Sequence, residues 1–216
     1  MDIDEKEISF RINNTYSTLN QLTDKTKNVW IVCHGLGYLS RYFIKYFKIL
    51  NREENYIIAP QAHSKYYQGN DFKYVGASWI TKENTEKEIQ NVLRNLDAVF
   101  EAENIPDDMN LIVLGFSQGV SISMRWVVSR KIKCDKLIIF SGSIPKEIKK
   151  EDVRFLKDHD CDIYCVVGSE DEFLTDARKK DETNKLKELF DDKVSITIFD
   201  GKHELKKEVL LEIIKR

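Results

Sequence analysis

One serine near the middle of the chain stands between two glycines. The segment GFSQG at 115–119 follows the apolar run LIVL at 111–114, and the apolar residues after it recur at helical spacing. A strand therefore turns directly into a helix, and side chains two positions before and after the serine would collide with the crossing backbone. The pattern predicts a nucleophile elbow in which the Ser117 hydroxyl attacks an acyl carbonyl. The alternative is that the glycines serve only the turn.

A serine hydroxyl is a poor nucleophile at neutral pH, so this chemistry requires a histidine base and a carboxylate that orients it. In hydrolases built on a wound sheet, the order along the chain is serine, acid, histidine. Of the four histidines only His159 and His203 follow Ser117. His159 precedes an expected strand, which places it at the opposite end of the sheet, so it is expected on the surface. His203 follows the last expected strand, and we predict that it is the base.

The acid should come from a loop at the carboxyl end of a strand, where ligands collect in parallel sheets. The segment CVVGSEDEF at 165–173 ends an expected strand and carries three acidic residues into such a loop. We favour Asp171, with Glu170 as the alternative, because Asp200 is too close to His203 along the chain. For any single acid here, a solvated loop or a helix cap is the competing interpretation.

Acyl transfer also needs donors for the oxyanion, each worth about 3 to 4 kcal/mol of barrier. The backbone amide of Gln118, at the start of the helix after the serine, is one candidate. A second donor is expected from the loop after an early strand. The segment VWIVCHGLG at 29–37 supplies that loop, and its glycines let the backbone turn an amide toward the serine.

Strands and helices alternate along the chain, as in a wound parallel sheet. Half-buried antiparallel strands are expected at 8–12 and 16–19, and buried parallel strands at 29–33, 55–60, 111–116, 136–142 and 162–168, with a last strand at 194–201. Helices are expected near 39–50, 84–102, 118–130, 174–190 and 204–216. The stretch at 59–78 is expected to be a long irregular loop, and its aromatic residues favour a functional role.

Length and composition limit the function classes. The 216 residues suit one α/β domain spanning 1–216, with no room for a large lid, and the formal charge of −2 gives no basic field for nucleic acid. The acidic start MDIDEKEI differs from a secretory signal, and no apolar run approaches the ~18 residues of a spanning helix, so a cytoplasmic protein without stable membrane insertion is expected. The four scattered cysteines form no C-x-x-C pair, and we expect no metal and no cofactor.

Seven segments resemble the small carboxylesterase/phospholipase-type α/β-hydrolases, a family that includes the acyl-protein thioesterases. They cover most of the chain in order: HGLG at 34–37, APQA at 59–62, SW at 78–79, GFSQG at 115–119, FSG at 140–142, VGSEDEF at 167–173 and GKHE at 201–204. The resemblance implies an α/β-hydrolase fold with a mostly parallel sheet flanked by helices. It also implies Ser117, Asp171 and His203 as the triad, and the backbone amides of Leu36 and Gln118 as the oxyanion hole.

Two features depart from the family pattern and bear on the substrate. Tyr38 stands where these enzymes usually carry aspartate, and the segment 63–76 lacks the expected proline-rich pattern. The substrate pocket is expected among large side chains of the active-end loops, first of all Tyr38, Leu39 and Trp79. The other candidates are Tyr66, Tyr67, Phe72 and Tyr74, and about half of the seven are expected to pack beneath the loops.

The sequence thus predicts a serine carboxylesterase or thioesterase that cleaves short to medium acyl chains through an acyl-enzyme. Its partner is a small-molecule ester or thioester, and a homodimer is left open. Two alternatives remain: a degenerate hydrolase fold that only binds a ligand, and another reaction on the same scaffold, such as peptide hydrolysis or acyl transfer to an acceptor other than water.

Overall fold

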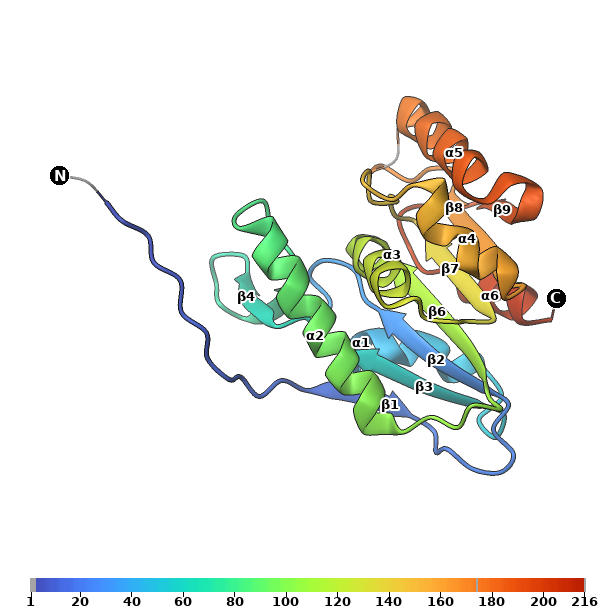
Figure 1. Cartoon of the computed structure of the whole chain (residues 1–216), viewed down its shortest axis with the longest axis horizontal. Coiled ribbons are helices and arrows are strands. Elements are labelled where there is room, and N and C mark those ends of the chain that lie inside the picture. Colours follow the sequence, from blue (N-terminus) through green and yellow to red (C-terminus); the bar gives the residue numbers. More distant parts are fainter. Residues whose placement is uncertain (1–2, 174, 216) are drawn as a thin grey trace.

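A computed structural model describes residues 3–173 and 175–215 of the chain. Its centre is a seven-stranded sheet with the order β1-β3-β2-β6-β7-β8-β9 (Figure 1). The strands are β1 (Tyr16–Leu19), β2 (Asn28–Cys33), β3 (Asn55–Pro60), β6 (Asn110–Phe116), β7 (Lys136–Phe140), β8 (Asp162–Gly168) and β9 (Val194–Phe199). Only β1 is antiparallel to its neighbour, and all other pairs are parallel. The mostly parallel sheet confirms the expected fold class.

Helices cover both faces of the sheet, which explains why the central strands are almost entirely apolar. One face carries α2 (Thr85–Glu103), α3 (Gln118–Arg130), α4 (Lys150–Asp158) and α5 (Asp176–Phe190). The other carries α1 (Ser40–Phe43), the 3-10 helix Ile44–Ile49 and α6 (Lys207–Ile214). A second 3-10 helix, Asp191–Lys193, precedes β9. In β2, Ile31 faces the first layer and Trp30 faces the second, so successive residues fill different cores.

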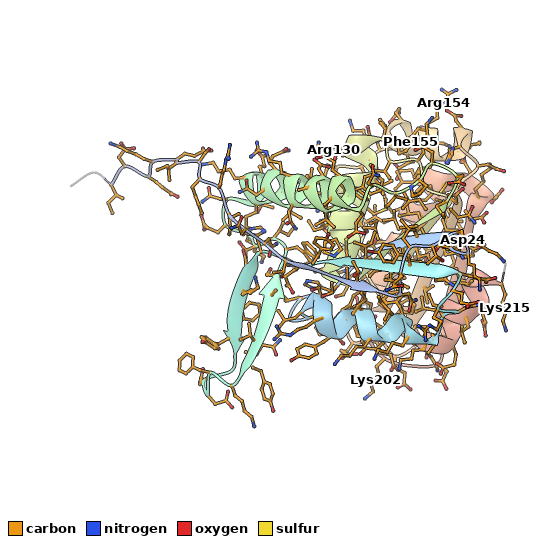
Figure 2. All side chains as sticks on the ribbon, turned by 90° about the horizontal axis from the view of Figure 1, so that it is seen from below. Asp24, Arg130, Arg154, Phe155, Lys202 and Lys215 are labelled. Carbon is orange, nitrogen blue, oxygen red and sulfur yellow. The ribbon has the colours of Figure 1, made fainter. Side chains whose placement is uncertain are left out.

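The segment 59–78 is not the irregular loop that the sequence suggested. After β3 it forms a hairpin of β4 (Ser64–Gln68) and β5 (Tyr74–Ser78), which pair antiparallel apart from the main sheet (Figure 2). Gly69 and Phe72 in the connecting turn have positive φ angles of 75° and 54°. Strand β4 is exposed on both sides, so apolar and polar residues do not alternate along it. The sequence therefore gives no strand signal for the hairpin.

Three further expectations change. Residues 8–12 form no strand, since nothing in the described part of the chain pairs with them. The helix near 39–50 divides into α1 and a 3-10 helix, and α4 was not expected, because its nine residues are too short for a clear helical period. The other helices lie where they were expected, within a few residues. None of the described helices is long and apolar enough to cross a membrane.

Candidate active site

Ser117 occupies a strained turn between β6 and α3. Its φ angle is +54°, a region that non-glycine residues rarely adopt and that costs on the order of 1 to 3 kcal/mol. The turn also explains both flanking glycines. A Cβ on Gly115 would lie 2.5 Å from the Cα of Val120, and a Cβ on Gly119 would meet the backbone carbonyl of Cys33. The expectation that side chains at these positions would collide with the crossing backbone is therefore confirmed.

Replacing the second glycine tests this account of the turn. We expect Gly119→Ala to lower the free energy of unfolding by about 3 kcal/mol or more, because the obstacle is the β2 backbone and cannot rotate away. Urea unfolding of the variant and the wild type measures the difference. A loss below about 1 kcal/mol would show that the close approach of α3 to β2 is not required.

His203 links the elbow to the acidic loop. Its Nε2 lies 2.8 Å from Ser117 Oγ, and its Nδ1 lies 2.8 Å from Asp171 Oδ2. Because a carboxylate can only accept, Nδ1 carries the proton and Nε2 is free to accept the serine hydroxyl proton. The structure thus brings together the three residues that the sequence selected, from the loops after β6, β8 and β9.

The same geometry separates Asp171 from the acids beside it. The Asp171 side chain has no exposed surface, and its Oδ1 also accepts the backbone amide of Phe173 at 3.0 Å. Glu170 and Glu172 are exposed, as are Asp200 and His159. Two bonds from fixed donors hold the Asp171 carboxylate against the imidazole. The Phe173 ring lies 4.7 Å from that of His203, centroid to centroid, and is exposed at the mouth of the site.

The loop at 34–37 passes beside the nucleophile. A Cβ on Gly35 would lie 3.2 Å from the Ser117 Cβ, so the backbone at this point is close to the hydroxyl. Gln118 is the first residue of α3, where backbone amides lack helical partners and the helix dipole favours negative charge. Among the described residues, neither the Leu36 amide nor the Gln118 amide donates to a loop or turn acceptor. Both remain available to an oxyanion.

The buried His34 fixes this loop, a role that the sequence did not indicate. Its Nδ1–H donates to the Gly35 carbonyl at 2.8 Å, and its Nε2 accepts the Ala62 amide at 3.2 Å. The imidazole is therefore neutral, and burial lowers its pKa from 6.5 to about 4. The Trp79 ring packs against it at a tilt of 32°, with 4.7 Å between ring centroids, and donates its Nε1–H to the His34 carbonyl at 2.7 Å. The HGLG loop is thereby anchored to the segments that begin and end the hairpin.

The neutral His34 makes stability depend on pH. Its pKa is lower in the folded state than in the unfolded state, so the unfolded chain binds more protons, and stability is lost as pH falls from 6.5 toward 4. Between pH 7 and pH 5 this residue should remove about 2 kcal/mol of the free energy of unfolding. Urea unfolding at the two pH values measures this difference. We expect the loss of about 2 kcal/mol to be absent in His34→Gln and present in His159→Gln, a change at an exposed position. Equal pH dependence in His34→Gln and the wild type would contradict this.

The Gln118 side chain has a second positioning role that the sequence left unassigned. Its Oε1 accepts the Trp79 amide at 2.9 Å, and its Nε2 donates to the Ile80 carbonyl at 2.8 Å. These bonds tie the elbow to the segment after β5. They explain why a side chain that both donates and accepts follows the serine.

The hairpin braces the loop at 34–37 from the other side. The Gly37 amide donates to the Ala77 carbonyl at 2.9 Å, and Gln68 Nε2 donates to the Gly37 carbonyl at 2.8 Å. Gly37 has φ of +83°, and Gly76 packs so closely that a Cβ there would lie 2.8 Å from the Gly37 Cα. Part of the role of the segment 59–78 is therefore to position the loop beside Ser117.

The expected pocket residues divide between core and surface. Leu39 and Trp79 are buried beneath the loops, and Tyr38 is half-buried against the rings of Phe43 and Phe116. These three side chains therefore support the loops around the site and do not form the wall of an open pocket. The hairpin aromatics are exposed instead: Tyr66, Tyr67, Phe72 and Tyr74. Three of the seven large side chains thus pack into the body of the protein.

The comparisons with known proteins agree with this architecture. A sequence model of the phospholipase/carboxylesterase family matches residues 14–216. The chain belongs to this phospholipase/carboxylesterase family. Membership supports a hydrolase of the esterase type that acts on small-molecule substrates. No curated protein matches the sequence significantly.

Solved structures of similar proteins share the fold of this family member. Acyl-protein thioesterase 2 of Zea mays aligns with a TM-score of 0.70 at 15% identity, covering 94% of this chain and 97% of that one. A phospholipase/carboxylesterase of Dyadobacter fermentans gives 0.63 at 17% identity, with 94% and 97% covered. Esterase PE8 gives 0.66 at 18% identity, with 94% and 99% covered. The matching lengths show that this chain carries no large inserted lid relative to them.

Proposed function

We propose that this protein is a serine carboxylesterase or thioesterase that cleaves short to medium acyl chains through an acyl-enzyme. The observation that carries the proposal is the hydrogen-bonded series from Ser117 through His203 to the buried Asp171, with 2.8 Å at both links. A serine in a strained elbow with a base and an orienting acid is the arrangement of an activated nucleophile.

In the proposed reaction, Ser117 Oγ attacks the carbonyl carbon while His203 Nε2 takes the hydroxyl proton. The carbonyl oxygen becomes an oxyanion, which the backbone amides of Leu36 and Gln118 stabilise. The imidazolium then gives its proton to the departing alcohol or thiol, which leaves the acyl group on Ser117. Water attacks this ester with His203 again as base, and collapse of the second intermediate releases the acid. Asp171 holds the tautomer and stabilises the imidazolium in both halves.

The surroundings of the series favour an apolar acyl group. Leu36, on the loop beside the nucleophile, and Phe173, against His203, are both exposed large apolar residues at the site. The buried Trp79 fixes the loop that carries Leu36, through its bond to the His34 carbonyl. Exposed apolar side chains that surround a reactive group provide binding energy to an aliphatic chain and little to a charged one.

Hydrolysis of a graded series tests the proposal. Nitrophenyl esters from acetyl to dodecanoyl, and matching acyl thioesters read with a thiol reagent, give kcat/KM for the wild type and for Ser117→Ala. We expect hydrolysis by the wild type alone, with an optimum at short to medium length. Folded wild-type protein that hydrolyses neither series faster than the variant would overturn the proposal and favour a ligand-binding role.

A further inference from the structure

Residues 3–13 form an N-terminal arm that leaves the body of the protein. The arm is extended and projects away from the sheet in both views (Figures 1 and 2), and its inner part shares a cavity with α2. Its base is fixed by Asn14, whose Nδ2 donates to the Gln61 carbonyl at 2.7 Å and to Asn95 Oδ1 at 3.2 Å. Farther out, Glu7 pairs with Lys87 at 2.9 Å across an exposed surface. Such a pair contributes little, so the arm is weakly held along most of its length.

The arm exposes apolar side chains in a regular pattern. Ile8, Phe10 and Ile12 have 84%, 78% and 64% of their surface exposed. Because they alternate, they share one side of an extended chain, while Glu7, Ser9 and Arg11 share the other. This is the pattern of a strand with one buried face, but the described part of the chain supplies no partner strand for it. An apolar row of this kind in a folded protein marks an interaction site.

The protein's own surface beside the outer part of the arm is mainly polar. A cavity of about 810 Å³ separates the arm from α2. The α2 residues that line it are polar along the first turns, and only the last two are apolar: Glu86, Lys87, Gln90, Asn91, Arg94, Asn95, Ala98 and Val99. Folding the arm against its own helix would therefore bury Ile8 and Phe10 against charged and amide groups, which costs free energy.

The arm leads directly into an edge of the sheet. It continues into β1, which pairs with β3 on one side only, so within the described residues its other backbone edge is open. Open edges and extended segments readily take up another strand through backbone hydrogen bonds. The arm and β1 are thus prepared for pairing with an extended segment from outside the chain.

We propose that the occupant is the arm of a second copy of this chain, paired antiparallel about a two-fold axis at Ser9. In this register Ile8 of each copy lies opposite Phe10 of the other, and Glu7 lies opposite Arg11. The dimer thus contains two apolar and two opposite-charge cross-strand pairs, which stabilise antiparallel strands. From residue 7 to residue 11 the arm sequence complements itself, as an isologous interface requires, whereas Lys6 lies opposite Ile12 at the ends of the paired segment. The result is an arm-linked homodimer with both active sites free.

A pair of cysteine variants tests the register. In Ser9→Cys the two sulfurs would lie on directly opposed residues, whose Cα atoms are about 4.5 to 5.5 Å apart. In Asn13→Cys, the matched control, each residue is four positions from the axis, so the two lie about 27 Å apart. The native thiols are free and largely buried, and the wild type serves as the blank. Under mild oxidation we expect a covalent dimer from Ser9→Cys only. Equal crosslinking of both variants, or none, would overturn the proposal.

Charge exchange provides an independent test. Glu7→Arg and Arg11→Glu should each be monomeric alone, because like charges then oppose each other in the pair. Mixed, they should form a heterodimer, since positions 7 and 11 are both basic in the first variant and both acidic in the second. Light scattering after size exclusion measures the masses. A wild type that is monomeric throughout, or single variants that dimerise as well as the mixture, would contradict the arm pairing. A dimer that persists in Phe10→Lys but is lost in Ile198→Lys would also contradict it, because Ile198 lies on β9 at the opposite edge of the sheet.

Discussion

Ser117→Ala should reduce the turnover of the best ester by about 10⁶-fold, because the members of a serine–histidine–acid series act as a unit. Without the hydroxyl, His203 has nothing to deprotonate at the elbow and no acyl-enzyme forms. In the variant, water would attack the bound substrate directly, helped only by the oxyanion donors and by substrate binding. The remaining rate would be on the order of 10³-fold above the uncatalysed rate.

The fold should survive this change. Alanine has the same Cβ as serine, so the strain at φ of +54° is unchanged, and only the bond to His203 Nε2 is lost. Far-UV circular dichroism and urea unfolding check this. Ser129→Ala is the matched control, since it removes a hydroxyl from α3 that donates to the Trp126 carbonyl at 3.5 Å and forms no bond with the triad. Turnover in folded Ser117→Ala above about one per cent of the wild type would remove Ser117 from the role of nucleophile.

Asp171→Asn should lower kcat by about 10⁴-fold and change KM little. The amide keeps the shape of the carboxylate, but it can donate to Nδ1 and so favour the tautomer whose Nε2 carries the proton. That nitrogen could then no longer accept from Ser117, and the imidazolium would lack its counter-charge. Steady-state kinetics on the ester found best in the series measures the loss.

The neighbouring acids are the controls for this prediction. Glu170→Gln and Asp200→Asn change exposed side chains that form no bond with the imidazole, so each should stay within a few-fold of wild-type kcat. A larger loss of kcat from Glu170→Gln than from Asp171→Asn would show that Glu170, and not Asp171, orients the imidazole. It would show that the loop after β8 adopts another arrangement when it acts.

The sequence predicted best those features that depend on the residue pattern within a single segment. The strands β2, β6, β7 and β8 are buried on both faces, which produces continuous apolar runs that predict a parallel sheet. The elbow is equally local, because close backbone contacts exclude side chains at positions 115 and 119, two residues before and two after Ser117. The order of strands then limited the acid and the base to a few residues, and the structure brings Asp171 and His203 to Ser117.

Features that depend on distant contacts could not be predicted in this way. His34 is fixed by an amide 28 positions away, and the Gln118 side chain by backbone groups about 40 positions away, so neither bond leaves a local pattern. Leu39 and Trp79 are large apolar residues near the site, and their types do not distinguish a pocket wall from the core beneath it. Residues 8–12 carry a strand pattern without a strand, because the pattern predicts a buried face but not what covers it.

Labelling with a fluorophosphonate would show whether Ser117 is an activated nucleophile, since this reagent modifies such serines and requires no knowledge of the natural substrate. Wild type, Ser117→Ala and Ser129→Ala would be treated at equal concentration, and the adduct located by peptide mass spectrometry. We expect one adduct, on Ser117, in the wild type and in Ser129→Ala, and none in Ser117→Ala. Folded wild-type protein that remains unlabelled, or Ser117→Ala labelled as fast as the wild type, would contradict this expectation.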